Sequence, residues 1–325
     1  MKAFIHNRYG APKEVLQLTE IDTPIPLEDE VLVQIKATTI NDYDWSLITG
    51  KPYLYRLLFG LFKPKNNIAG MELAGIITQV GKNVTKWKIG DEVFGDISDT
   101  TTGSFAEYIA VKQEHLLAKP KELSFTTAAS IPHAGALAYQ ALHDIGNIKE
   151  NQTILINGAG GGVGTLALQI AKQYNCIVTG VDSIDKFDML RSLGFDSLID
   201  YKQTNFTKEN TQYDLVLDCK TNKAPLNYLK ALKPNGKYVS IGGTVGKLLS
   251  LFFWSKVTSL FSQKSLAILA LKTNTNLDKL LEGFNNNTYK GQINGPYPFE
   301  QLPEQVAHFG AAKHKGKIVI TFENL

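Results

Sequence analysis

The stretch that most constrains the fold of this chain is TILINGAGGGVGTLALQIAKQYNCIVTGVDS, at residues 153–183. Its pattern predicts an apolar strand, a glycine-rich turn, an amphipathic helix over 165–174 and a second apolar strand. A strand before such a turn and a helix after it form the setting in which glycines bind the pyrophosphate of a dinucleotide. The first N–H groups of the helix and the positive end of its dipole favour that anion.

A glycine-rich loop without a function is the alternative interpretation of this turn. Gly160, Gly161 (or Gly162) and Gly164 would let the backbone turn tightly and approach a phosphate. Asp182 ends the second strand, where an acidic residue is expected after a dinucleotide-binding turn. The combination of strand, turn, helix and acidic residue favours a dinucleotide-binding site.

The alternation of helices and strands continues beyond this motif, and an Ala-rich helical stretch at 126–142 precedes it. We expect helices at 185–193 and 224–232 and strands at 197–201, 214–219, 237–243 and 265–272. Because the strands are apolar throughout, they fit a parallel sheet that is covered on both faces. The sequence therefore predicts a doubly wound α/β domain with right-handed crossovers.

The flanking segments have a different pattern. Short β-branched runs separated by turn residues occur at 30–40, 73–81 and 104–111, and 88–96 reads as a turn leading into a strand. After the α/β region we expect helices at 276–284 and 300–312 and a last strand at 316–322. These segments predict an irregular β-rich domain.

Length and composition set broad limits on function. A chain of 325 residues suits two domains, and a net charge of +3 with no basic block does not favour nucleic acid. We expect no signal peptide, and the apolar cluster at 248–261 is too short to span a bilayer and contains Lys256. Cys176 and Cys219 each stand alone in an apolar run, which suits buried free thiols in a cytoplasmic protein.

Several stretches, in this order, resemble the medium-chain dehydrogenase/reductase superfamily. They are MKAFIHNRYGAP at the start, EVLVQIKATTIN, GMELAGIITQVG, IGDEVFG, GSFAEYIAV, the glycine-rich turn, and HKGKIVI near the end. The resemblance implies a GroES-like catalytic domain at 1–124 plus 273–325, interrupted by a Rossmann domain at 125–272. It also implies an active site in the cleft between the domains, and a homodimer formed through the edge of the Rossmann sheet.

Zinc-dependent members of this superfamily carry catalytic ligands at positions matching Asn41, Met71 and a later cysteine. Here the first two residues supply neither a thiolate nor an imidazole, and no cysteine precedes Cys176. A catalytic zinc needs three protein ligands, and we interpret His115 and His133 as isolated structural histidines. The chain therefore resembles the zinc-free quinone oxidoreductase branch, and a zinc alcohol dehydrogenase with unusual ligands is disfavoured.

Loss of zinc restricts the substrate, because hydrogen-bond donors must then stabilise the developing negative charge. A reduced quinone resembles a phenol, whose pKa is about 10, whereas a saturated alkoxide is nearly as basic as hydroxide. We therefore expect NAD(P)H-dependent reduction of quinones or other α,β-unsaturated carbonyl compounds, with a small hydrophobic electrophile as substrate. The alternative is a nucleotide-binding protein with little turnover, acting as a sensor or scaffold.

The expected catalytic residues are Asn41, Tyr43, Asp44 and Tyr139. The resemblance places Asn41 facing the nicotinamide and makes Asp44 a structural hydrogen-bonding residue, while the tyrosines are candidate donors or walls. The sequence names no general acid, and water could supply the proton. Two aromatic segments, 53–62 and 248–261, are unusually apolar for loops of this scaffold. We expect these two segments to form core or subunit contacts or, alternatively, a lid that accepts a flat or lipid-like substrate.

The choice of nicotinamide cofactor depends on residues that follow the second and third strands. Asp182 alone favours NADH, because a carboxylate repels a 2′-phosphate. The resemblance favours NADPH, held by Ser183, Lys186 and Tyr201. The place of Asp182 before Ser183 would let its side chain turn away and cap the next helix. We expect NADPH, with NADH as the alternative. The expected cofactor-binding residues are Gly160, Gly161, Gly162, Val163, Gly164, Asp182, Ser183, Lys186, Tyr201, Cys219, Gly242 and Gly243.

Overall fold

The computed structural model describes residues 1–322, and its chain divides into two units. Unit 1 contains Met1–His133, Thr273–Leu277 and the segment from Ile293 to the end, and unit 2 contains Ala134–Lys272 and Asp278–Gln292. The expected boundary at 124/125 and the expected assignment of all of 273–325 to the first domain differ from this division. The segment Asp278–Gln292 belongs to unit 2, where the side chain of Gln169 donates to the carbonyl of Lys290 and accepts its N–H.

Unit 2 is built on a six-stranded parallel sheet in the order β10-β9-β8-β11-β12-β13. The strands are β8 (Thr153–Asn157), β9 (Ile177–Asp182), β10 (Ser197–Asp200), β11 (Tyr213–Asp218), β12 (Leu232–Ser240) and β13 (Ser265–Ile268). Counted from β8, this is the 3-2-1-4-5-6 order of the Rossmann fold, which confirms the predicted doubly wound α/β sheet. The order reverses between β8 and β11, so the connections diverge there and leave a ligand-binding position at the carboxyl ends.

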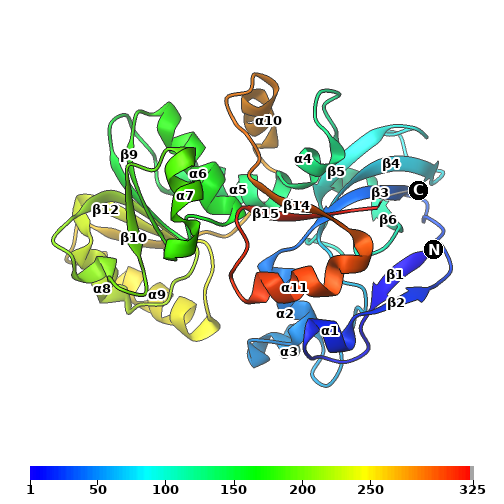
Figure 1. Ribbon diagram of the computed structural model, residues 1–325, viewed down its shortest axis with the longest axis horizontal. Coiled ribbons are helices and arrows are strands. Elements are labelled where there is room, and N and C mark those ends of the chain that lie inside the picture. Colours follow the sequence, from blue (N-terminus) through cyan, green and yellow to red (C-terminus); the bar gives the residue numbers. More distant parts are fainter. Residues whose placement is uncertain (323–325) are drawn as a thin grey trace. The chain divides into compact units, whose positions relative to one another are not determined.

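Helices cover both faces of this sheet, as right-handed crossovers require (Figure 1). They are α6 (Gly162–Gln173) and α7 (Phe187–Leu193) on one face, and α8 (Pro225–Lys230) and α9 (Val245–Thr258) on the other. Residues of α8, α9 and the sheet form a common core, which includes Leu155, Val216, Tyr228, Tyr238 and Leu251. The strands carry apolar residues throughout because both of their faces are buried.

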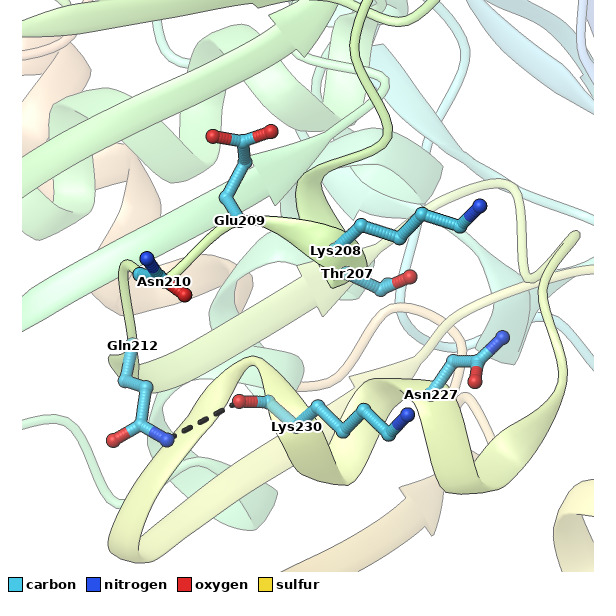
Figure 2. Close-up of a pocket in the computed structure, with 7 residues that line it drawn as sticks. All are labelled: Thr207, Lys208, Glu209, Asn210, Gln212, Asn227 and Lys230. Atoms are coloured by element: carbon cyan, nitrogen blue, oxygen red, sulfur yellow. Dashed lines mark hydrogen bonds between the residues drawn. The ribbon is translucent and has the colours of Figure 1, made fainter.

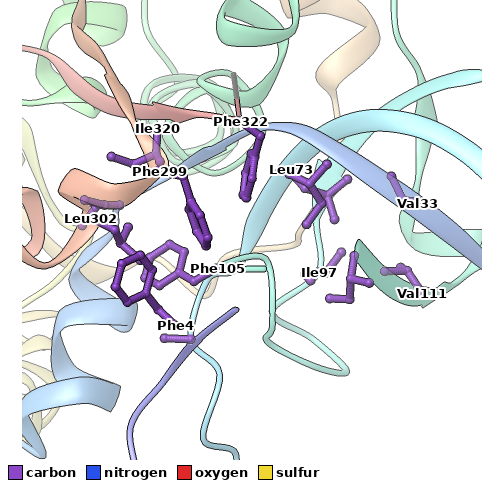
Figure 3. Packing of buried hydrophobic residues seen from close by; sticks show 14 of the residues in the cluster. Phe4, Val33, Leu73, Ile97, Phe105, Val111, Phe299, Leu302, Ile320 and Phe322 are labelled. Carbon is purple, nitrogen blue, oxygen red and sulfur yellow. The ribbon is translucent and has the colours of Figure 1, made fainter. Parts of the chain in front are cut away.

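Unit 1 contains a seven-stranded, mainly antiparallel sheet in the order β14-β15-β3-β4-β5-β7, with β6 paired to β3. The strands are β3 (Glu30–Thr39), β4 (Glu72–Val80), β5 (Glu92–Asp96), β6 (Tyr108–Lys112), β7 (Leu117–Ala118), β14 (Ile293–Pro298) and β15 (Lys317–Thr321). A separate hairpin-like pair joins β1 (Lys2–Ile5) to β2 (Gln17–Glu20). Figure 3 shows the core of this unit, where Phe4, Phe105, Phe299 and Phe322 pack with aliphatic side chains of the sheet.

The strand directions in unit 1 gather polar residues at one end of the sheet. β15 begins at Lys317, β3 ends just before Asn41, β4 begins at Glu72 and β5 ends at Asp96. These strands are successive neighbours and run antiparallel. The first residues of β15 and β4 therefore lie at the same edge of the sheet as the last residues of β3 and β5. In the register of β4 and β5, Glu72 and Asp96 are directly paired, and their side chains therefore share a face.

Helices in unit 1 occupy the connections. They are α1 (Pro12–Val15), α2 (Asp42–Thr49), η1 (Tyr53–Tyr55), α3 (Arg56–Phe59), η2 (Gln113–His115), α4 (Phe125–Ala129), η6 (Phe299–Gln301) and α11 (Leu302–Gly310). The segment 53–62 is therefore partly helical and is not a loop throughout. Helix α2 follows Asn41 at its N-cap and is terminated by Gly50 at its C-cap, whose φ of 63° is left-handed and suits glycine.

Other elements differ from the sequence-based expectations in their bounds. The helical stretch 126–142 is divided into α4, α5 (Pro132–Gln140) and a π-helical turn η3 (Ala141–Ile145), and the expected helix 276–284 is α10 (Leu277–Asn285). The strand expected at 104–111 begins only at Tyr108. Remaining short helices of unit 2 are η4 (Ile184–Lys186) and η5 (Phe206–Lys208).

The apolar segment 248–261 forms most of helix α9, so the expectation of a loop there is wrong. The segment contains no proline to interrupt a helix, and the helix is anchored where Leu251 packs into the core of unit 2. Phe252 and Phe253 remain exposed. Within residues 1–322, neither this helix nor any other combines the length and apolar character needed to cross a membrane.

Candidate functional site

The glycine-rich turn joins β8 to α6 at the point where the strand order reverses. Gly164 lies in the first turn of α6, and a Cβ there would come within 2.5 Å of the carbonyl oxygens of Gly158 and Ala159. The helix begins at Gly162 after Gly161 as N-cap, and no side chain in the described chain caps it. The N–H groups that start this helix, including that of Val163, therefore lack intrahelical partners, which fits a pyrophosphate.

Asp182, at the end of β9, is bound to the turn. Its Oδ2 accepts the N–H of Gly160 at 2.8 Å, and its Oδ1 accepts the N–H of Ser183 at 2.8 Å. The ammonium of Lys186 lies 3.2 Å from Oδ1, and both side chains are largely buried. The expectation that Asp182 caps the following helix is wrong, because neither η4 nor α7 has a side-chain cap.

The remaining residues expected to hold the 2′-phosphate have different environments. Ser183 is buried next to Asp182, whereas Tyr201 follows β10 and its side chain is exposed. The N–H of Tyr201 donates to the carbonyl of Asp182, so the two strand ends are held together. Lys186 reaches this region with its charge already paired to Asp182, which reduces the repulsion that a lone carboxylate would exert on a phosphate.

A second group of buried polar residues follows β11. Asp218 accepts from Asn157 Nδ2 at 2.8 Å, from the N–H of Thr221 at 2.9 Å and from the hydroxyl of Tyr238 at 2.9 Å. These bonds fix the loop that contains Cys219. Burial raises the pKa of the Cys219 thiol to about 12, so it remains a neutral thiol at physiological pH.

Two glycines expected near the cofactor follow β12. A Cβ on Gly243 would lie 2.8 Å from that of Thr221, and the φ of Gly243 is 156°. Gly242 has more space, since its nearest atom would be the carbonyl oxygen of Cys219 at 3.8 Å. The close packing of Gly243 against the loop after β11 keeps the carboxyl ends of the sheet compact.

A shallow polar depression on unit 2 does not coincide with the glycine-rich turn (Figure 2). It is lined by Thr207, Lys208, Glu209, Asn210, Gln212, Asn227 and Lys230. The loop that forms it leads into the start of β11, whereas the glycine-rich turn follows the end of the parallel neighbour β8. The depression therefore lies toward the amino ends of the strands, opposite the expected cofactor position.

Unit 1 contains a buried polar cluster at the edge where β15, β3, β4 and β5 meet. The Lys317 ammonium lies 2.6 Å from Oε2 of Glu72 and also donates to Oδ1 of Asn41. Asn41 Nδ2 donates to the same Glu72 oxygen at 2.8 Å, as does the Thr39 hydroxyl at 2.5 Å. Glu72 has no exposed surface, so its charge is balanced by Lys317 and by these hydrogen bonds.

This arrangement changes the role expected for Asn41. Its amide oxygen accepts from Lys317, and its amide nitrogen donates to Glu72 and, at 3.4 Å, to Thr39. Asn41 is therefore part of an internal network, and its amide N–H groups point to protein acceptors. The sequence could not show that Glu72 and Lys317 lie beside this residue, because both are distant along the chain.

Asp44 and Tyr43 lie next to this cluster on α2. The Asp44 carboxyl accepts the N–H of Asn41 at 2.8 Å and that of Gly70 at 3.0 Å, so it connects two loops, as expected of a structural residue. Burial raises the pKa of Asp44 to about 7, although both hydrogen bonds and Lys317 act against this. Burial, together with the charges of Asp44 and Asp96, also raises the pKa of Tyr43, so its phenol keeps its proton.

Tyr139, the remaining expected catalytic residue, belongs to unit 2. Its ring stacks on His143 with centroids 4.0 Å apart, and the ammonium of Lys279 lies 5.6 Å from its centroid. His143 in turn pairs with the hydroxyl of Tyr174 at 3.0 Å. Tyr139 is thus a member of an aromatic stack of its own unit.

The structure adds residues that sequence reasoning did not select. His133 Nδ1 lies 2.8 Å from Oδ2 of the fully buried Asp96, and the N–H of His133 donates to Oε1 of Glu72 at 2.6 Å. We interpreted His133 as an isolated histidine because its partners are distant in sequence. Asp96, Glu72 and Lys317 lie within GDEVFGD, GMELAG and HKGKIVI, but nothing in those stretches indicates that they meet.

The parallel sheet with a glycine-rich turn at its reversal point, in a chain that also has a β-rich unit with a buried polar cluster, fits a dinucleotide-binding protein of the oxidoreductase class. Two family models match the chain: an alcohol dehydrogenase GroES-like domain over residues 27–121 and a zinc-binding dehydrogenase domain over residues 193–320. The match of both domains confirms the fold class that the sequence predicted.

Individual relatives define the family more closely. The chloroplastic quinone-oxidoreductase homolog of Spinacia oleracea is 30% identical over 98% of both chains. The chloroplastic NADPH-dependent alkenal/one oxidoreductase of Arabidopsis thaliana is 29% identical over 98% of this chain and 79% of its own. The quinone oxidoreductase structure from Coxiella burnetii has a TM-score of 0.88 at 25% identity, covering 99% of both chains. The chain belongs to the quinone oxidoreductase branch of the medium-chain dehydrogenase/reductase superfamily.

The description of one family model as zinc-binding raises the question of whether zinc fits this chain. Asn41 is engaged with Glu72 and Lys317, and the Met71 side chain is buried with 1% exposure. In the part of the chain that the structure describes, no three His, Cys, Asp or Glu side chains gather as metal ligands would. The donor set at this position does not fit a zinc ion, which requires three such ligands.

Proposed function

We propose that this protein reduces quinones or other α,β-unsaturated carbonyl compounds with NADPH and without zinc. One observation carries the proposal: where zinc-dependent members have ligands, this chain has the Asn41, Glu72 and Lys317 network. A cation with fixed hydrogen bonds is already present there. The relatives named as quinone and alkenal/one oxidoreductases support the same substrate class.

The chemistry of the acceptor follows from the groups present. A reduced nicotinamide held at the glycine-rich turn would supply a hydride, and negative charge would then develop on the acceptor oxygen. A quinone or an enone delocalises that charge, so hydrogen-bond donors are sufficient where a simple ketone would need a metal. Tyr43 keeps its phenolic proton and is the donor that we assign to this oxygen.

Support for NADPH comes from the end of β9. Asp182 uses its oxygens on the turn and on Lys186, so its negative charge is offset within the protein. Lys186 and Ser183 then supply a cation and a hydroxyl near the adenosine ribose, which suits a 2′-phosphate. A carboxylate free to accept from both ribose hydroxyls would favour NADH instead.

The test is oxidation of NADPH with a panel of quinones, enones, aldehydes and simple ketones. We expect turnover with the first two classes and none with simple ketones. Purified protein should contain far less than one zinc per chain, and a chelator should leave the activity unchanged. Stoichiometric zinc that is lost together with activity would contradict zinc independence. Cofactor binding without oxidation by any acceptor would favour the nucleotide-binding alternative.

We also propose a cytoplasmic location and a homodimer. A cytoplasmic location rests on the isolated cysteines, of which Cys176 is buried and both are free. A homodimer rests on the resemblance and on the position of β13 as an edge strand of the parallel sheet. Sedimentation of the purified protein would test the dimer directly.

A further inference from the structure

The imidazole of His133 has one nitrogen fixed and the other free. Nδ1 lies 2.8 Å from Oδ2 of Asp96, whose other oxygen accepts the N–H of Ser98 at 2.9 Å. Within residues 1–322, Nε2 of His133 has no hydrogen-bond partner, and 21% of the side chain is exposed. The ring is therefore held by a buried carboxylate and presents its second nitrogen to solvent or a ligand.

The electrostatics of the pair determine which nitrogen carries hydrogen. Burial alone would raise the pKa of Asp96, but hydrogen bonds from His133 and Ser98 outweigh it and lower that pKa. Asp96 is therefore ionised and can only accept, so Nδ1 of His133 is the protonated nitrogen of the neutral ring. A carboxylate bonded to Nδ1 in this way fixes the orientation of the ring and leaves Nε2 as the nitrogen that gains and loses a proton.

The backbone position of His133 is fixed just as firmly. His133 is the second residue of α5, and its N–H, which has no partner inside the helix, donates to Glu72. Glu72 also binds Asn41 and Lys317. The ring therefore extends from the same buried cluster that replaces the zinc ligands.

We propose that His133 is the proton donor of this enzyme, oriented by Asp96 and positioned by Glu72. This inference rests on the proposed reduction of enones and quinones. The other acidic groups of the cluster are less suited to the task. Asp44 is fully buried and bound by two backbone N–H groups, and Glu72 is saturated by four donors.

An enone receives the hydride and the proton at two different carbon atoms. Hydride adds to the β-carbon with its electron pair, and the C=C pair shifts toward the carbonyl to give an enolate. The Nε2–H bond of the His133 imidazolium then breaks, and a C–H bond forms at the α-carbon as the carbonyl is restored. The ring is left neutral with its Nδ1–H on Asp96, and the exposed Nε2 takes a new proton from water.

The experiment compares an enone with a quinone in His133→Gln. Protonation of an enolate at carbon needs a positioned acid, and such catalysis is worth about 10²–10⁴-fold. A reduced quinone needs its proton on a phenolic oxygen with pKa about 10, which water can supply. We expect kcat with cyclohexenone to fall at least 100-fold, kcat with benzoquinone to change less than about fivefold, and KM to stay within about threefold. Asp96→Asn should show the same pattern more weakly.

The matched control is His308→Gln on α11, which should leave both activities unchanged. Equal losses with both acceptors in His133→Gln would mean that the residue is structural, and no loss with either would also overturn the proposal. If the native protein reduces neither acceptor, the result contradicts the proposed function, and the proposed role of His133 is then wrong as well.

A second measurement does not depend on activity. Diethyl pyrocarbonate modifies accessible imidazole nitrogens, and peptide mass spectrometry locates the product. We expect His133 to react and His6, which has no exposed surface, to resist in the folded protein. A His133 as unreactive as His6 would show that Nε2 is not available to a substrate and would overturn the proposal.

Discussion

The ammonium of Lys317 and the carboxylate of Glu72 lie 2.6 Å apart in the interior of unit 1 and connect β15 to β4. Both side chains are at least nine-tenths buried. Removal of one partner of such a pair leaves an uncompensated buried charge, whereas removal of both does not. The pair therefore controls the stability of the edge on which Asn41 and His133 are placed.

Lys317→Met should destabilise the protein by about 3–5 kcal/mol, because the charge of Glu72 is then buried without a cation. The double variant Glu72→Gln with Lys317→Met should recover a large part of that loss. Urea unfolding of each variant measures the effect. The exposed Lys82–Glu28 pair provides the control, and Lys82→Met should change stability by less than about 1 kcal/mol. A double variant no more stable than Lys317→Met would contradict this account.

Asp44 should make stability depend on pH. Its pKa of about 7 in the folded state lies above the unfolded value of about 3.9, so the folded state holds the proton more tightly. The resulting stabilisation is complete below about pH 4 and is lost as the pH rises to about 7. Relative to Asp44→Asn, the native protein should lose up to about 4 kcal/mol between pH 4 and pH 8.

Unfolding of both proteins by urea across this pH range measures the difference. Asp42→Asn serves as the control, because Asp42 lies on the same helix with an exposed side chain and should change stability by less than about 0.5 kcal/mol at either pH. A difference between native protein and Asp44→Asn that does not vary with pH would show that Asp44 is not the responsible group.

Gly162→Val should abolish binding of the nicotinamide cofactor. The residue is the first of α6, and a branched side chain there would obstruct the approach of a pyrophosphate to the helix N-terminus. Circular dichroism should show an unchanged fold, and nucleotide fluorescence should show loss of binding. Gly246→Val is the control, because a Cβ at Gly246 would have no atom within 4 Å. Unchanged affinity in Gly162→Val would mean that the turn has only a structural role.

Lys186→Met should remove the preference for NADPH. We expect the native protein to favour NADPH over NADH by about tenfold or more in kcat/KM, which is about 1.4 kcal/mol. The variant should lose this factor while its kcat/KM for NADH stays within about threefold. Lys202→Met is the control, because Lys202 is an exposed residue that lies 3.9 Å from Asp185. A native preference for NADH, or an NADPH preference that survives in Lys186→Met, would contradict the assignment.

Local sequence was sufficient for the elements that depend on neighbouring residues. The glycine-rich turn, the flanking apolar strands and α6 were predicted because their signals lie within one continuous stretch, at 153–183. The prediction of a loop at 248–261 is wrong, because an apolar run without clear periodicity does not distinguish a helix from other structures.

The candidate site depended on contacts that are distant in the chain. The sequence by itself determined the doubly wound sheet and the place of the glycine-rich turn, because both follow from periodicity and glycine placement, while the order of several longer stretches carried the resemblance to the superfamily. Only the tertiary structure decided that Lys317 neutralises Glu72, that Asn41 is internally bonded and that His133 is oriented by Asp96. The physical reason is strand pairing: the antiparallel register of β15, β3, β4 and β5 brings together residues whose separation along the chain conceals their interaction.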